Sequence, residues 1–476
     1  MGILGTAAGR AKQELLPSTI ASSPVMFSCE ISLRVRVFLL TIFLIFITAL
    51  SILCSQLLVA SQSSSTSAAA IDYWAMTTAF YTTAADDKSS SLNSETTTRF
   101  LSEIAAIDPS ERLMRQQTQD LLAAQTPSEY DKRQLYVSTK DPQYNFRVQL
   151  AQISTSRYIP FWPQFKRLLR TWAETKSRSV DPQQVMHSLV SQIQAPIRRH
   201  YQQQQLDSGT RELEKQQQPQ QQPSRLNQTT QMISRYRSCA VVGNSGILLQ
   251  QSYGSAIDAH EMVMRLNNAR TVGFEKFVGS KTTISFLNSN ILHRCSFRSD
   301  CFCHPYGANV PIVLYICQVI HLMDIAMCGN VHKAAPLLVT DPLFDSLIAK
   351  IVKWYSVKEF MQKTGESFAR WNSVHDGENF HYSSGMQAVM LAMGICEEVD
   401  LFGFGKDDGS QHHYHTRQKE ELGLHDYEAE YRIYEHLSSL KQEQKKAPGD
   451  SNFVATHKLP FLNGSGFELP PLHVFR

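Results

Sequence analysis

Apolar and polar positions alternate in a regular way along the second half of the chain. From Ser238 onward, short apolar runs of strand length are separated by longer stretches with helical periodicity. The first run, Ser238–Val242, carries no charge and ends at the glycine-bounded turn Gly243–Gly246. Strands that alternate with helices are typical of a parallel sheet covered by helices. The pattern predicts an α/β domain with a parallel central sheet within residues 141–476.

Two helices are predicted ahead of this sheet. Aromatic and leucine side chains recur at helical spacing over residues 161–172, and Pro163 suits a first helical turn. A second amphipathic helix opens at Asp181-Pro182 and is expected to end at Pro196. Glutamine runs then interrupt residues 202–231, which predicts a disordered Gln-rich insertion within the catalytic region.

An uncharged apolar run covers residues 37–60. It is long enough to cross a hydrocarbon layer of ~30 Å as a helix. Basic residues outnumber acidic ones before it, whereas the first charge after it is Asp72. The charge bias predicts a single-pass type II membrane protein, with a cytoplasmic tail at 1–36 and a lumenal remainder. A cleaved signal peptide with its cleavage site near Ala60 is the alternative.

Residues 61–140 are rich in Ser, Thr, Ala and Gln and have weak apolar periodicity. Such a segment cannot bury enough apolar surface to offset the entropy lost on ordering. It is predicted to be a flexible stem with a transient helix around 111–124. Ordered structure is expected to begin near Tyr144.

Composition adds two points. A net charge of +3 on 476 residues is too weakly basic to indicate nucleic-acid binding, so no nucleic-acid partner is expected. If the chain beyond residue 60 is lumenal, Asn227 and Asn463 become glycosylation acceptors because each begins an Asn-x-Ser/Thr sequon. The cysteines can then form disulfides as well.

The turn Gly243–Gly246 (GNSG) opens a series of recognisable segments. Its glycines allow a tight turn, and backbone N–H groups there suit a phosphate or a ribose. Four segments follow one another in an order that resembles the sialylmotifs of the eukaryotic sialyltransferases, glycosyltransferase family 29. They are VVGNSG to GSKTT at 241–283, HYSSGMQAV to FGFG at 381–405, HHYH at 412–415, and His425 with Glu430. The overall look is most similar to plant sialyltransferase-like proteins.

This resemblance implies a single Rossmann-like domain, a variant of the GT-A fold, that holds a cytidine monophosphate (CMP) sugar. Ser383, Ser384 and Gly385 precede a predicted helix whose N-terminus would favour a phosphate. Without the resemblance, Ser383-Ser384 would indicate a helix N-cap and nothing more. The implied donor-binding residues are Asn244, Ser245, Asn267, Ser383, Ser384 and Gly385.

Two histidines carry the implied chemistry. His425 matches the family's general base, which takes the proton of an acceptor hydroxyl as that oxygen attacks the anomeric carbon with inversion. A neutral imidazole with an ordinary pKa near 6.5 suits this step. His413 matches the residue that contacts the leaving phosphate, where an imidazolium would stabilise the departing charge. Glu430 either orients the base or faces solvent.

No metal or other cofactor is expected beside the CMP-sugar donor. Asp407 and Asp408 are adjacent rather than spaced as Asp-x-Asp, and a CMP sugar carries a single phosphate. The family's disulfide matches Cys239 and Cys396. Disulfides or buried thiols remain open for the other cysteines of this region, and a zinc site with His293 and His304 is a weaker alternative. Those cysteines are Cys295, Cys301, Cys303, Cys317 and Cys328.

The resemblance therefore implies a Golgi glycosyltransferase that moves a sialic acid-like sugar from a CMP donor to a glycan acceptor. Three features depart from the family pattern: Tyr382 replaces a usual proline, Thr416 replaces an acidic or amide residue, and the segment between His413 and His425 is short. Two alternatives stay open. One is a CMP-Kdo transferase acting on a pectic polysaccharide, and the other is an inactive Golgi nucleotide-binding or scaffold protein.

Overall fold

A computed structural model describes most of the C-terminal three quarters of the chain. These residues all lie in the larger of two compact units, residues 95–476. The described ranges are 109–129, 157–213, 234–375, 380–407, 409–418, 425–444, 459, 461–462 and 469–475. The predicted tail 1–36, membrane segment 37–60 and glycosylation sites Asn227 and Asn463 lie outside them. Among the described residues, no helix has the length and hydrophobicity needed to cross a bilayer.

The described residues form one sheet of seven strands in the order β5-β4-β3-β2-β1-β6-β7, and every pairing is parallel. The predicted parallel sheet is thus confirmed. Strands β1, β2 and β4 are buried along their whole length, as expected for strands covered on both faces. The strands are β1 (Cys239–Val242), β2 (Met262–Leu266), β3 (Ile284–Asn288), β4 (Ile312–Tyr315), β5 (Leu337–Val339), β6 (Val399–Phe402) and β7 (Leu472–Phe475).

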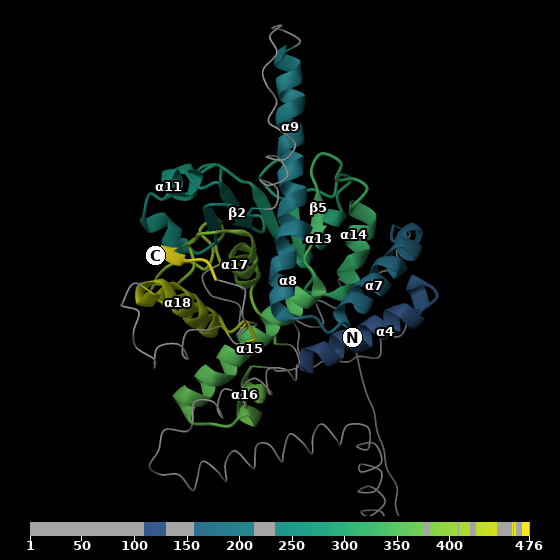
Figure 1. Cartoon of the computed structure of the whole chain (residues 1–476). Coiled ribbons are helices and arrows are strands. Elements are labelled where there is room, and N and C mark those ends of the chain that lie inside the picture. Colours follow the sequence, from purple (N-terminus) through teal and green to yellow (C-terminus); the bar gives the residue numbers. More distant parts are fainter. Residues whose placement is uncertain are drawn as a thin grey trace, which may run out of the picture. The chain divides into compact units, whose positions relative to one another are not determined.

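Helices surround the sheet in a layered α/β arrangement (Figure 1). Their bounds are α4 (Pro109–Ala123), α7 (Trp162–Lys176), α8 (Pro182–Leu189), α9 (Ala195–Leu213), α11 (Gly254–Asp258), α12 (Glu275–Val278), α13 (Ser289–Ser296), α14 (Leu322–Cys328), α15 (Pro342–Thr364), α16 (Phe368–Val374), α17 (Ser384–Ile395) and α18 (Tyr427–Gln444).

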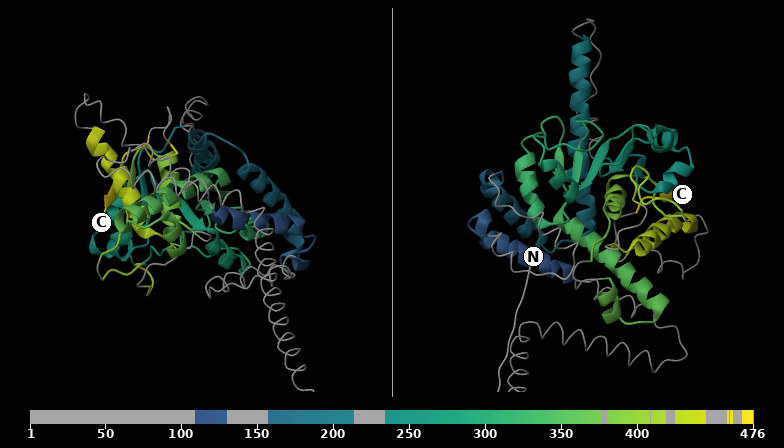
Figure 2. Two further views of the ribbon diagram at one scale, coloured as in Figure 1. Left: turned by 90° about the horizontal axis from the view of Figure 1, so that it is seen from below. Right: turned by 180° about the vertical axis from the view of Figure 1, so that it is seen from behind.

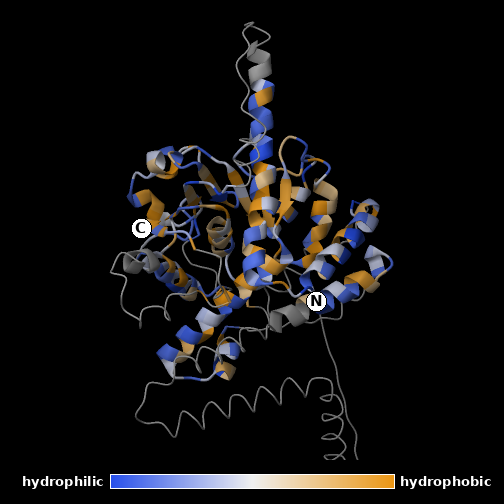
Figure 3. Ribbon diagram, in the orientation of Figure 1, coloured by the Kyte–Doolittle hydropathy of each residue, from blue (hydrophilic) through white to orange (hydrophobic). Residues whose placement is uncertain are grey.

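Helix α17 is the central helix of one face. It packs against β1, β2, β3 and β6, and it is buried from Gly385 to Ile395. Its apolar character stands out in Figure 3. A disulfide joins Cys396, at the C-terminal end of α17, to Cys239 on β1. This is the pairing that the family resemblance implied, and it ties the helix to the strand next to the glycine-bounded turn.

Two further disulfides lie near α13. Cys295 pairs with Cys303, and Cys301 pairs with Cys328. The alternative of a zinc site built on these cysteines is therefore wrong. Cys317 lies outside these pairs, with its sulfur 2.9 Å from the hydroxyl oxygen of Ser289.

Helix α4 differs from the predicted flexible stem. Leu121 and Ala124 are completely buried in a cluster with Phe165 and Leu169 of α7. Helices α4 and α7 lie side by side in the views of Figure 2. Local composition did not indicate this because the burial depends on contacts with residues about forty positions further along the chain. The helix predicted around 111–124 is present, but it is packed into the core and is not part of a flexible stem.

The helical region around Pro196 also differs from its prediction. A π-helical turn, Val190–Gln194, links α8 to α9, and α9 continues through Pro196 to Leu213. A wider turn before the proline accommodates a residue that has no N–H and whose ring would clash with the preceding helical turn. Tyr201 donates a hydrogen bond from its hydroxyl to the Thr283 carbonyl at 2.8 Å. The predicted disordered insertion is therefore helical over residues 202–213.

Candidate active site

The chain order reverses between β1 and β6, which creates a crevice at the carboxyl ends of these strands. Ligands in parallel α/β folds bind at such a switch point. The Gly243 N–H donates to the Phe402 carbonyl at 2.8 Å, and a Cβ on Gly243 would lie 2.5 Å from the Gly403 oxygen. Only glycine fits at position 243. The predicted turn at 243–246 thus meets the FGFG segment at 402–405 at one edge of the sheet.

A cavity of about 800 Å³ opens at this edge. It is bounded by the turns after β1, β2, β3 and β6, by the N-terminus of α17, and by the segments at 411–418 and 425–434. Every predicted catalytic and donor-binding residue lines it. These are His425, His413, Asn244, Ser245, Asn267, Ser383, Ser384 and Gly385.

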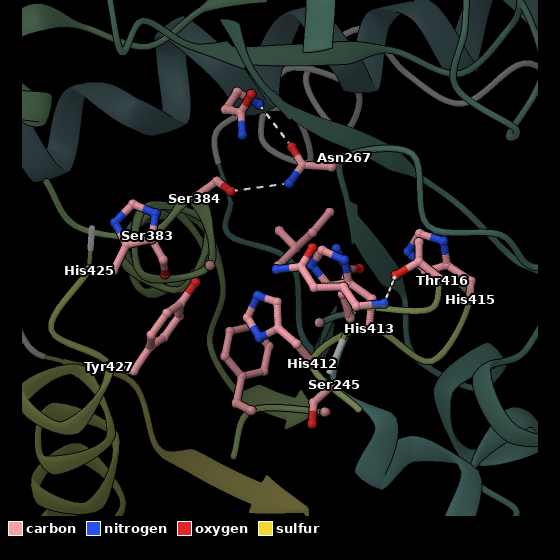
Figure 4. A pocket seen from close by; sticks show the side chains of 18 of the residues that line it. Ser245, Asn267, Ser383, Ser384, His412, His413, His415, Thr416, His425 and Tyr427 are labelled. Atoms are coloured by element: carbon pink, nitrogen blue, oxygen red, sulfur yellow. Dashed lines mark hydrogen bonds between the residues drawn. The ribbon is translucent and has the colours of Figure 1, made fainter. Parts of the chain in front are cut away.

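Asn267 connects the first two motifs across the cavity wall. Its backbone adopts a left-handed conformation with φ of 54°, which asparagine tolerates better than most residues. Its side-chain N–H donates to the Ser384 hydroxyl at 3.2 Å, and its side-chain oxygen accepts the Asn288 N–H at 3.1 Å (Figure 4). The side-chain oxygen of Asn244 is buried without a protein hydrogen-bond partner. Such an orphaned acceptor fits a site that a polar ligand completes.

The N-terminus of α17 is held by a buried carboxylate. Ser383 caps the helix by accepting the Met386 N–H at 3.1 Å. Glu430 accepts the Ser383 N–H at 2.6 Å through one oxygen and the Ser383 hydroxyl at 2.5 Å through the other. Burial raises the pKa of Glu430 to about 7, while the bonds from Ser383 oppose that shift. Glu430 therefore orients the N-terminal end of α17, which neither sequence alternative anticipated.

His425 is oriented by a backbone carbonyl. Its Nδ1 lies 2.9 Å from the His381 oxygen, so Nδ1 carries the proton and the lone pair is on Nε2. The next residue, Asp426, caps α18 by accepting the Ala429 N–H at 3.1 Å. Asp426 also accepts the Ser356 hydroxyl of α15 at 2.5 Å. The imidazole is thus fixed between two anchored segments, in the tautomer that a general base needs.

Aromatic and imidazole rings in contact with one another continue the cavity wall from His425. His425 contacts Tyr427 at 5.5 Å between ring centroids, Tyr427 contacts His412 at 5.5 Å, and His412 contacts His413 at 4.4 Å. His413 stacks on His415 at 5.5 Å. Figure 4 shows His425 and Tyr427 on one side of the view and His413 and His415 on the other.

Burial decides the charge state of the His413 ring before a ligand binds. Burial and the neighbouring His412 lower the pKa of His413 to about 4. Burial and His413 likewise lower the pKa of His415 to about 4. Both rings are neutral near pH 7 in the unliganded protein. The imidazolium predicted at His413 concerns the ring beside a leaving phosphate. A bound anion would favour protonation and raise these pKa values.

Two cationic side chains at the cavity were missed by sequence reasoning. Arg294 on α13 and Lys406 after β6 both line it and are exposed. Glu430 is the sole carboxylate among the described lining residues. The position of Arg294 in the chain could have indicated it. Helix α13 follows the carboxyl end of β3, and ligands bind at that edge of parallel sheets.

Comparison with known proteins decides the family. Residues 183–442, more than half of the chain, match the profile of glycosyltransferase family 29 (sialyltransferase). The chain belongs to glycosyltransferase family 29. The resemblance predicted from the four motifs is confirmed, and the protein is a glycosyltransferase. Membership of family 29 implies a nucleotide-sugar donor and a glycan acceptor, and family members are typically Golgi enzymes.

The relatives of this family 29 enzyme carry different names. "Beta-1,6-galactosyltransferase GALT29A" of Arabidopsis thaliana is 47% identical over 352 residues, covering 71% of this chain and 81% of the relative. "Sialyltransferase-like protein 1" of Oryza sativa subsp. japonica is 51% identical, covering 50% of this chain and 58% of the relative. A mammalian sialyltransferase crystallised with Gal-beta-1-3GalNAc-ortho-nitrophenol is 30% identical with a TM-score of 0.30, covering 43% of this chain and 66% of that chain.

Proposed function

We propose that this enzyme transfers a sugar from a nucleotide donor to a glycan hydroxyl with inversion at the anomeric carbon, and that His425 is the general base. The observation that carries the proposal is the hydrogen bond between His425 Nδ1 and the His381 carbonyl at 2.9 Å. This bond favours the tautomer with the proton on Nδ1 and the lone pair on Nε2, which is the tautomer that a general base uses. The fold proposed for the domain is the Rossmann-like variant of GT-A.

The proposed reaction is a single displacement. The acceptor oxygen attacks the anomeric carbon on the face opposite the nucleotide, and its proton passes to His425 Nε2. The bond between the anomeric carbon and the phosphate oxygen breaks, so the nucleotide leaves with the electron pair. Asn244 and Asn267 hold the nucleotide, and the first turn of α17 and His413 face the phosphate. Charge that develops on the leaving group is stabilised by these fixed donors.

A divalent metal is not needed in this proposal. A metal site for Mg²⁺ or Mn²⁺ usually requires carboxylate oxygens. Glu430 is the one carboxylate among the described lining residues, and both of its oxygens already bind Ser383. The helix N-terminus, the imidazoles and the cationic side chains would take over the role of the metal.

Two donors are proposed, each with its own support. A nucleotide-linked galactose is favoured by the 47% identity to a β-1,6-galactosyltransferase over 81% of that relative's length. A CMP-linked sugar acid, either sialic acid or Kdo, is favoured by the sialylmotifs and by the 33% identity to a mouse α-2,3-sialyltransferase. We place the galactose donor first because that relative matches a larger share of this chain.

The deciding experiment uses the purified full-length chain in detergent. UDP-galactose, CMP-sialic acid and CMP-Kdo are supplied separately, each with and without galactan or pectic oligosaccharides, and nucleotide release is measured. Acceptor-dependent release from one donor, abolished in His425→Ala, supports the proposal. Donor binding without turnover on any acceptor would instead support the inactive nucleotide-binding protein.

We also propose a type II topology in the Golgi membrane, with residues 1–36 cytoplasmic, 37–60 in the bilayer and the stem and catalytic domain lumenal. Its support is the uncharged run and the charge bias of the flanks. Glycosidase treatment of the expressed protein should reduce its apparent mass through Asn227 and Asn463. Replacing both asparagines by Gln should abolish that change, and an unaltered mass in the wild-type protein would contradict a lumenal domain.

A further inference from the structure

Helix α13 presents one of its faces to the cavity. It starts directly after β3, where the side chain of Asn288 caps it by accepting the Ile291 N–H at 3.2 Å. Asn290, Ile291, His293 and Arg294 line the cavity from this helix. Positions i, i+1, i+3 and i+4 lie on one side of a helix. Arg294 is exposed there, at the end of the helix face.

Helix α13 is also fixed to the core. Buried His293 binds Asp324 of α14 through Nδ1 at 2.9 Å, and Tyr158 donates to the other oxygen of that carboxylate at 3.2 Å. The Ser289 hydroxyl lies 2.8 Å from His321 Nδ1. Cys295 adds the disulfide to Cys303. These contacts restrict the motion of α13. The backbone of Arg294 is therefore held in a fixed position relative to the edge of the sheet.

The charges around the cavity are asymmetric. Glu430 is the one acidic side chain among the described lining residues, and Ser383 occupies both of its oxygens. Burial lowers the pKa of His412, and that of His413 to about 4, so these rings are neutral before a ligand binds. Arg294 and Lys406 therefore both face the cavity as cations, and of the two only Arg294 carries a guanidinium. A guanidinium matches the paired oxygens of a phosphate or a carboxylate.

We propose that Arg294 binds the second anionic group of the sugar donor, beyond the phosphate that faces the N-terminus of α17. The inference rests on the proposed function, because it assigns a donor group to this same cavity. In a nucleoside diphosphate sugar the second group is the additional phosphate. In a CMP-linked sugar acid it is the sugar carboxylate. Arg294 is thus a specificity-determining residue, which selects donors with two anionic groups over nucleoside monophosphates.

The test measures ligand affinity by calorimetry with the full-length protein. UMP is compared with UDP and UDP-galactose, and CMP is compared with CMP-sialic acid. In one of the two series, the wild-type protein should bind the ligand with two anionic groups at least about tenfold more tightly than the nucleoside monophosphate. Such a gain in affinity is typical of a charge-assisted hydrogen bond. Arg294→Ala should abolish that preference while monophosphate affinity stays within about twofold, and Arg294→Lys should restore part of it.

Arg199→Ala is the matched control, since Arg199 is exposed on α9 and does not line the cavity. It should leave both affinities unchanged, and an unchanged melting temperature should show that Arg294→Ala is folded. The series in which Arg294→Ala abolishes the preference identifies the group that Arg294 binds. Loss in the uridine series indicates a phosphate, and loss in the cytidine series indicates a carboxylate. An equal loss for monophosphates, or no loss at all, overturns the inference and leaves the proposed function intact. Failure of the wild-type protein to bind any of these nucleotides overturns both.

Discussion

The Glu430 carboxylate accepts two hydrogen bonds from Ser383, one from its backbone N–H at 2.6 Å and one from its hydroxyl at 2.5 Å. One residue comes from the last motif in the chain and the other from the second motif. The contact fixes the start of α17, because Ser383 is at the same time the cap of that helix. The motif that carries the proposed base is thereby coupled to the helix end that is proposed to bind the donor phosphate.

Replacing Glu430 by Gln should weaken donor binding. The amide can accept one of the two bonds but has no charge, and hydrogen bonds to charged groups contribute about 1.5–3 kcal/mol. We expect donor affinity to fall about 10- to 100-fold in calorimetry. Glu435→Gln, on the same helix but half exposed, is the control and should bind the donor normally. Unchanged affinity in Glu430→Gln would contradict the positioning role.

Glu430 should also make the free energy of unfolding depend on pH. The folded pKa of Glu430, about 7, lies above the unfolded value of 4.5, so the folded state holds more protons between these pH values. Its contribution to stability should therefore fall as pH rises from about 4.5 to 7 and then level off. Urea unfolding of wild type and Glu430→Gln should give a difference that follows this course. A difference independent of pH would show that the carboxyl does not titrate there.

The Cys239–Cys396 disulfide closes a loop with a sequence separation of 157 residues. Removing a disulfide across a long loop costs on the order of 3–5 kcal/mol. The double variant Cys239→Ser/Cys396→Ser should therefore have a lower denaturation midpoint and a lower secreted yield. Cys317→Ser, which removes a thiol outside the disulfides, is the control. An unaltered midpoint in the double variant would mean that the bond does not form in the protein.

Binding of an anion should protonate His413. The pKa of its free imidazole is about 4, below the ordinary 6.5, and a neighbouring phosphate favours the charged ring. Nucleotide binding near pH 5 should therefore take up protons from the buffer. Calorimetry in buffers of different ionisation enthalpy measures this uptake. The proton uptake should be smaller in His413→Gln than in wild type. Equal uptake in both proteins would show that His413 does not contact the phosphate.

Much of this architecture follows from sequence pattern. The uncharged run at β1 and the glycine-bounded turn after it predicted a buried parallel strand, because apolar side chains on both faces require cover on both sides. The pairing of Cys239 with Cys396 and the grouping of His425 with Asn244 came instead from the order of the family's motifs. Both depend on residues more than 150 positions apart, which local periodicity cannot connect.

The misses arise where distant contacts decide local structure. Polar composition at 109–123 suggested a stem, yet Leu121 finds its apolar partners in α7. Pro196 suggested a helix end, yet the π-helical turn before it accommodates the ring. Glu430 and Arg294 are ordinary charged residues in the sequence. Their positions at one cavity follow only from how α18 and α13 pack on the sheet.

The proposed role of His425 as the general base is tested by comparing the kcat of His425→Ala with that of wild type on the productive donor and acceptor. General-base catalysis typically contributes 10²–10⁴-fold in rate. We expect kcat to fall by at least about a hundredfold in His425→Ala, while the calorimetric affinity for the nucleotide stays within about twofold. Turnover at the wild-type rate in that variant, with nucleotide binding intact, would contradict the assignment of His425 as the base.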